Sequence, residues 1–132
     1  MISPTGADRA EIDEALIEKL VRRFYDRVRG DAELGPIFAA VIGDDWEPHL
    51  QKMFAFWSSL MLMSGRYKGR PMQAHIRLKG VQPAHFDIWL RLFKQTSDEV
   101  CSPEMSALFV DKASRIAQNF SIGMFTPGRI NI

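Results

Sequence analysis

Between two apolar segments, the chain reads Met63-Ser64-Gly65-Arg66-Tyr67-Lys68-Gly69-Arg70-Pro71-Met72-Gln73-Ala74-His75. This stretch begins a long connection, rich in Gly, Pro and basic side chains, that runs on to Pro83. A connection of this length inside a small domain is usually functional or disordered. Because it carries a Tyr, a Met and a His, we interpret it as a binding loop.

The composition is that of an ordinary globular protein with one domain. The chain has 132 residues, of which 46% are hydrophobic and 25% charged, so it can bury a core without disulfides. The formal net charge is +1, which gives no electrostatic reason to expect nucleic acid as a partner. Nothing in the sequence indicates an obligate dimer, and we expect a monomer.

The sequence also favours a cytoplasmic location. Its only cysteine, Cys101, cannot form an intramolecular disulfide, which fits a reducing compartment. The first residues lack a cationic stretch followed by an apolar run, so we expect no signal peptide. The longest apolar run, 60–63, is too short to span a bilayer, and we expect no membrane association.

Hydrophobic periodicity predicts an all-α fold without strands. Apolar residues recur every three or four positions in four long segments, 12–30, 45–63, 84–101 and 102–122. A short helix, 37–42, is expected between turns at Gly35-Pro36 and Gly43-Asp44. Asp8 with Glu11 is a candidate N-terminal cap for the first helix.

Later helix boundaries also have recognisable signals. Pro48 suits the first turn of the second long helix, where a missing N–H costs little. Ser102 is a suitable N-cap for the last helix, with Pro103 at its first position.

The chain lacks the common catalytic and phosphate-binding motifs. It contains no HExxH, GxGxxG, phosphate-binding loop or GxSxG sequence. Zinc normally takes three or four protein ligands, which argues against zinc in a chain with one Cys and three dispersed His. A haem iron needs only one protein ligand, commonly a neutral imidazole. His75 in a basic loop, His49 on a helix and many aromatic residues fit that requirement, although a lone loop histidine is usually a surface residue.

Other polar residues have two interpretations each. The cluster Arg66, Lys68, Arg70, Arg77 and Lys79 either meets an anionic group or is a solvated loop surface. For His85, at the start of the third long helix, we favour a surface or capping role over iron binding. We interpret Cys101 as a small apolar residue and not as a nucleophile.

The segment 67–75 resembles the Tyr-x-Gly-x-Pro-Met-x-x-His segment of truncated haemoglobins, in which the His is the proximal haem ligand. Four further motifs follow in the family's order: Phe24-Tyr25, Gly35-Pro36-Ile37-Phe38, Trp46-Glu47-Pro48-His49 with Phe56-Trp57, and Phe86-Asp87-Ile88-Trp89-Leu90. The chain resembles the group III branch, because it combines His49 with Tyr25 and Trp89 and lacks the paired-glycine motifs. The resemblance implies a truncated globin fold, a two-over-two helical sandwich, forming a single domain over 1–132 with its core at about 12–122.

The resemblance also implies haem b as the cofactor and a set of site residues. His75 would ligate the iron, and Tyr25, His49, Met53 and Trp89 would form the distal pocket. His49 could bond the ligand, swing outward as a gate, or bind the iron itself. Candidate haem contacts, with Arg66, Tyr67 and Arg70 toward the propionates, are Phe38, Trp57, Arg66, Tyr67, Arg70, Met72, Ile76, Phe86 and Phe93.

The function that this resemblance implies is reversible binding of O₂, NO, CO or similar ligands. One alternative is a haem enzyme with peroxidase-like or NO dioxygenase activity, served by a reductase. His75 has no carboxylate beside it, since Ala74 and Ile76 flank it, and this favours binding over peroxide chemistry. A second alternative is a helical interaction module without haem.

Overall fold

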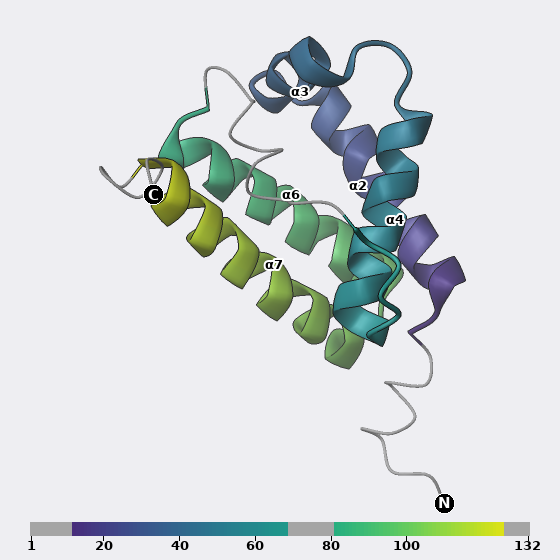
Figure 1. Ribbon diagram of the computed structural model, residues 1–132. Helices are drawn as coiled ribbons and strands as arrows, with labels where there is room; N and C mark the ends of the chain where they lie inside the picture. The colour runs from purple at the N-terminus through teal and green to yellow at the C-terminus, as the bar shows by residue number, and fades with distance from the viewer. Residues whose placement is uncertain (1–11, 69–80, 126–132) are drawn as a thin grey trace, which may run out of the picture.

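Five helices make up most of the residues that the computed structural model describes, which are 12–68 and 81–125 (Figure 1). No strand occurs within these residues, so the predicted all-α class is confirmed for them. The helices are α2 (Glu14–Gly30), α3 (Leu34–Ile42), α4 (Glu47–Leu62), α6 (Pro83–Val100) and α7 (Pro103–Phe125).

The helices pack as two pairs that are joined through α2. One pair is α2 with α4, and the other is α6 with α7, which lie side by side in Figure 1. Contacts between α2 and α6 hold the two pairs together, and α3 packs against both of these helices. This arrangement follows from the apolar stripes, because each helix can bury its stripe only against another helix.

The first long helix begins two residues later than predicted. Its N-cap is Asp13, whose carboxylate accepts a hydrogen bond from the backbone N–H of Leu16 at 2.9 Å. The predicted cap of Asp8 and Glu11 lies outside the described residues. The predicted apolar stripe is confirmed, because six of its side chains are buried: Ile17, Leu20, Val21, Phe24, Tyr25 and Val28.

The turn predicted at Gly35-Pro36 is wrong, because both residues lie in the first turn of α3. The carboxylate of Asp31 accepts hydrogen bonds from the N–H groups of Glu33 and Leu34 at 3.0 and 2.9 Å, which starts this helix early. Proline is tolerated in a first turn, whose N–H groups have no partner within the helix. Gly35 is needed for close packing, since a Cβ there would lie 2.7 Å from the carbonyl oxygen of Arg29.

The remaining boundaries agree with the sequence to within a few residues. Pro48 lies in the first turn of α4, as predicted. The hydroxyl of Ser102 accepts a hydrogen bond from the N–H of Met105 at 3.2 Å, which confirms its capping role before Pro103. The largest difference is at the end of α7, which continues to Phe125.

Ion pairs reinforce the interfaces of α2. Arg22 forms two hydrogen bonds with Glu47 of α4, at 3.1 and 3.0 Å. Arg27 reaches α6, where it donates to Thr96 at 2.9 Å and to Glu99 at 2.6 Å. Each guanidinium therefore joins α2 to one of its two main neighbours.

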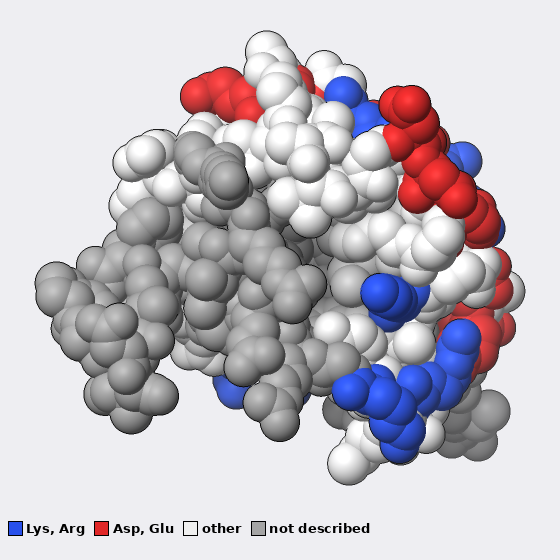
Figure 2. All heavy atoms as spheres, turned by 45° about the horizontal axis from the view of Figure 1, so that its top comes forward, with Lys and Arg blue, Asp and Glu red and all other residues white. Residues whose placement is uncertain are grey.

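The surface carries charges of both signs. On the face shown in Figure 2, Asp and Glu side chains lie along the upper and right-hand edges, and Lys and Arg side chains gather mainly at the lower right. Within the described part of the chain, no helix is both long enough and apolar enough to cross a membrane.

Gly35→Ala should lower the free energy of unfolding by about 1–3 kcal/mol, because the added methyl group meets the end of α2 and overpacks this contact. Gly30→Ala is the control, since nothing lies within 4 Å of a Cβ at that position. It should be neutral or stabilising by up to about 1 kcal/mol. Urea unfolding of both variants measures the difference, and equal stabilities would contradict the close approach.

Candidate functional site

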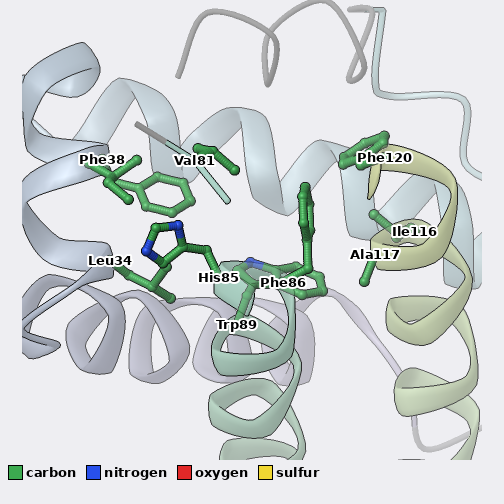
Figure 3. A pocket seen from close by; sticks show the side chains of 10 residues that line it. Leu34, Phe38, Val81, His85, Phe86, Trp89, Ile116, Ala117 and Phe120 are labelled. Atoms are coloured by element: carbon green, nitrogen blue, oxygen red, sulfur yellow. The ribbon is translucent and has the colours of Figure 1, made fainter. Parts of the chain in front are cut away.

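An apolar pocket opens between α3, the N-terminal half of α6 and the C-terminal half of α7 (Figure 3). About 420 Å³ inside it is free of protein atoms, part of this open to solvent. A concave apolar wall with a few polar groups is the usual form of a small-molecule or cofactor site. The pocket is lined by Leu34, Ile37, Phe38, Val81, His85, Phe86, Trp89, Ile116, Ala117 and Phe120.

Within this lining, only His85 and Trp89 carry a polar side-chain atom. The Nδ1 of His85 accepts a hydrogen bond from the backbone N–H of Gln82 at 2.8 Å, which caps α6. The capping role favoured for His85 is thus observed. Its Nε2 lies 3.7 Å from the carboxylate of Glu33 on the α2–α3 connection. Because Nδ1 is an acceptor here, the neutral imidazole carries its proton on Nε2.

The Trp89 wall of the pocket rests on a stack of aromatic rings. The ring of Phe93 stacks on Trp89 at 5.8 Å and 16°, and on Trp57 of α4 at 5.0 Å and 15°. Phe24 of α2 meets both Trp89 and Phe93 edge-on, at 5.5 and 5.2 Å. Trp57 and Phe93 were predicted as haem contacts, and the structure places both in the core behind Trp89, buried and outside the pocket lining.

A second aromatic group adjoins the pocket through Phe38. The ring of Tyr25 lies 6.2 Å from Phe38, 5.0 Å from His49 and 6.0 Å from Trp46, measured between centroids. Tyr25 and His49 do not line the pocket themselves, but Phe38 contacts Tyr25 on one side and the pocket on the other. The structure thus brings three predicted distal and haem-contact residues, Tyr25, Phe38 and His49, into one group.

This second group is well shielded from water. Tyr25 is only 4% exposed, and the Nε2 atom of His49 is buried. Burial raises the pKa of the Tyr25 hydroxyl far above its ordinary value. Tyr25 is therefore a neutral hydroxyl at any physiological pH, able to donate a hydrogen bond. Met53, one turn after His49, is half-buried and packs against the core.

Two predicted propionate contacts lie elsewhere in the described structure. Arg66 pairs with Glu14 at the start of α2, and Tyr67 packs its ring on Phe56 with the centroids 5.3 Å apart. Both residues follow the C-terminal end of α4, and neither lines the pocket. The other predicted residues of the long connection, Arg70, Met72, His75 and Ile76, lie outside the described residues.

On α3 and α7, sequence reasoning found only Phe38 and missed the other residues that line the pocket. Leu34 and Phe38 are one helical turn apart, and so are Ile116 and Phe120, so each pair presents two side chains on one face. These stripes were visible in the sequence. However, their periodicity is the same for a residue that lines a pocket and for one that fills a core.

Comparisons with known proteins agree with this geometry. A family model described as bacterial-like globin matches residues 12–120. The group 3 truncated hemoglobin ctb of Campylobacter jejuni is 35% identical over 120 residues, covering 89% of this chain and 94% of that protein. The crystal structure of the group III truncated hemoglobin from Campylobacter jejuni matches with a TM-score of 0.84 and 35% identity, over 89% of this chain and 94% of that one.

The chain therefore belongs to the bacterial-like globin family. Its fold is the all-α globin fold, and its branch is that of the group III truncated haemoglobins, as the sequence motifs indicated. Membership of the globin family implies a haem cofactor with its iron, and the binding of small diatomic ligands in general.

Tyr25→Phe should make the free energy of unfolding depend less on pH in the alkaline range. Burial raises the pKa of the Tyr25 hydroxyl in the folded state, so its contribution to stability is fully present below the unfolded-state pKa of about 10. Above that pH this hydroxyl ionises in the unfolded state but not in the folded state. The free energy of unfolding therefore falls by up to about 1.4 kcal/mol per pH unit. Urea unfolding between pH 8 and 11 should show this fall in the parent and a flatter profile in the variant.

Tyr67→Phe is the matched control for this measurement. Burial also raises the pKa of Tyr67, but this ring is only half-buried, so its removal should change the alkaline slope less. Parallel pH profiles for the parent and Tyr25→Phe would show that Tyr25 ionises as easily in the folded protein as in the unfolded one.

Proposed function

We propose that this protein binds haem b, with His75 as the proximal iron ligand, and that it reversibly binds O₂ and other diatomic ligands. The observation that carries the proposal is the juxtaposition of Tyr25, His49 and Phe38 beside an apolar pocket walled by Trp89. The hydrogen-bonding groups Tyr25 and His49 thus lie next to an apolar pocket, which is what a bound diatomic ligand on an apolar cofactor requires. In this proposal the whole chain, 1–132, acts as one globin domain.

The described residues fit a flat apolar cofactor. The pocket wall is made of aliphatic and aromatic side chains, and Phe38, Phe86 and Trp89 offer ring surfaces from two different helices. Arg70 is the propionate partner that we favour, with Arg66 and Tyr67 as further candidates. Arg66 would first have to leave Glu14, with which it pairs. Met72 and Ile76 would complete the proximal wall.

The path of the chain after α4 allows His75 to reach the site. The N–H of Tyr67 donates to the hydroxyl of Ser59 at 2.8 Å, so the chain has turned back along α4 by one turn. His75 follows Tyr67 by eight residues, which span at most about 26–29 Å. The ten helical positions from Ser59 back to His49 take only about 15 Å. A proximal histidine level with His49 is therefore within reach.

In this proposal the haem iron supplies the coordination position at which a diatomic ligand binds. Tyr25 would donate a hydrogen bond from its neutral hydroxyl to the ligand. Trp89 would act in the same way through its indole N–H, since this group can only donate. Donors held in a water-excluded site are stronger than the same donors in water, so they should slow ligand release. His49, beside Tyr25, would bond the ligand or control its entry.

His75→Ala should abolish normal haem retention, or change the visible absorption spectrum of the protein that retains haem. The reason is the loss of the only proposed bond between the chain and the iron. Added imidazole is the control, because it replaces the lost ligand without any further change to the chain. It should restore a spectrum close to that of the parent in His75→Ala. The assignment of His75 is refuted if His75→Ala has the parent spectrum.

Tyr25→Phe should speed the release of O₂ from the reduced protein by about tenfold, the equivalent of one hydrogen bond worth about 1.4 kcal/mol. Stopped-flow replacement of O₂ by CO measures the rate. Tyr67→Phe, the other tyrosine of the chain, should release O₂ at the parent rate. If Tyr25→Phe also does so, the hydroxyl makes no bond to the ligand.

A further inference from the structure

The chain leaves α4 through a tight turn. Met63 adopts the left-handed conformation with φ of 57°, and Gly65 has φ of +73°. This turn reverses the chain, so that the ring of Tyr67 lies edge-on against Phe56 and its N–H reaches the hydroxyl of Ser59. The residues that enter the long connection are thus folded back against α4.

Four side chains, which we call the anchor cluster, hold this turn in place: Glu14, Ser58, Ser64 and Arg66. The hydroxyl of Ser58 lies 2.6 Å from one carboxylate oxygen of Glu14 and 2.7 Å from the hydroxyl of Ser64. Arg66 pairs with the other carboxylate oxygen of Glu14, and its N–H donates to the Ser64 hydroxyl at 3.3 Å. The cluster therefore joins the first turn of α2, the last turn of α4 and the connection.

The protons in the anchor cluster have only one consistent order. An ionised carboxylate can only accept, so Ser58 donates its single hydroxyl hydrogen to Glu14. In the contact between the two serines, Ser64 must then be the donor. The Ser64 oxygen accepts from the N–H of Arg66. The hydrogen bonds thus run in one direction, from the connection through both serines to Glu14.

Ser58 is fully buried, so its hydroxyl depends on protein partners for its hydrogen bonds. It is 0% exposed, and those partners are Glu14 and Ser64. Glu14 is the first residue of α2, where the helix dipole favours a negative charge. Releasing the connection would leave the Ser58 hydroxyl with Glu14 alone and Arg66 without its carboxylate.

We propose that the anchor cluster positions the segment that carries His75, with Glu14 as its fixed point on α2. This inference rests on the proposed function, in which His75 is the proximal ligand. The cluster fixes the position of the chain at Ser64 and Arg66, and the segment that carries His75 starts from there. Removing Glu14 or the Ser58 hydroxyl would give the start of the segment more freedom, and His75 would be held less firmly. With Arg66 in this anchoring role, Arg70 and Tyr67 are left as the candidate partners of the propionates.

The ion pair between Arg22 of α2 and Glu47 of α4 provides a matched control. Arg22 and Glu47 have exposed fractions of 44% and 53%, compared with 42% and 44% for Arg66 and Glu14. The Arg22–Glu47 pair ties α2 to α4 near the other end of α4, and no hydrogen bond joins it to residues 63–68. Its removal should loosen the helix pair without releasing the connection.

The test compares Glu14→Ala and Ser58→Ala with Glu47→Ala in the full chain. The first readout is the rate at which haem is lost to an excess of a haem-scavenging apoglobin. The second is the iron–histidine stretching band of the reduced protein. The third needs no haem and is the amide hydrogen exchange of Arg66 and Tyr67. Urea unfolding of each variant corrects for global stability.

Glu14→Ala and Ser58→Ala should lose haem about fivefold faster than the parent, the factor that one lost hydrogen bond typically produces. They should also shift or broaden the stretching band and speed the exchange of both amides. Glu47→Ala should match the parent in all three at comparable stability. The proposal is overturned if all three variants behave alike, or if Glu14→Ala leaves haem loss and exchange unchanged.

Failure of the proposed function has a different signature. If the parent binds no haem, or if His75→Ala behaves as the parent does, then His75 is not the ligand and the positioning role falls with it. If haem binding depends on His75 while the anchor variants retain haem normally, only the positioning role is overturned.

Discussion

The stacking of Phe93 between Trp57 and Trp89 is the contact on which the rest of the structure depends. Phe93 is fully buried, and its two neighbours belong to α4 and to its own helix α6. Phe24 adds the edge of an α2 ring to the same stack. Aromatic contacts of this kind contribute beyond the area that they bury. One side chain thus joins three helices and at the same time sets the position of a pocket wall.

This arrangement separates the groups that hold the fold from those that can meet a ligand. Trp57 and Phe93 are occupied with packing, while Trp89 has one face on the stack and another toward the pocket. Phe38 has a similar position between Tyr25 and the pocket. A ligand in the pocket would therefore contact side chains that are already ordered by the core. Such preorganisation lowers the entropy cost of binding.

Periodicity predicted the helices well because each stripe is buried against another helix, as in α2. Ser102 and Pro48 were also predicted correctly, since their capping and first-turn roles depend on local backbone chemistry. The turn at Gly35-Pro36 was mispredicted because its outcome depends on Asp31 and on the contact with Arg29. The contact joins the end of α2 to the start of α3 only six residues along the chain, and the turn propensities of Gly and Pro do not report it.

The site was only partly predictable for a similar reason. The motifs identified Tyr25, Phe38, His49 and Trp89, which the structure places in or beside the pocket. The spacing of residues along a helix shows on which side of the helix each residue lies. It does not show whether that side packs against the core or lines a pocket. This is why the sequence did not separate Trp57 and Phe93, which lie in the core, from Ile116 and Phe120, which line the pocket. The pairing of Arg66 with Glu14 spans 52 residues, and no sequence pattern indicated it.

The visible absorption spectrum of the purified protein, with haemin added in increments, tests the central claim most directly. The pocket and the group around Tyr25 predict a strong Soret band that grows in proportion to haemin and saturates at one haem per chain. Addition of CO to the reduced protein should then shift this band. A protein that purifies without a Soret band and gains only the spectrum of free haemin on titration would contradict the assignment of this site to haem.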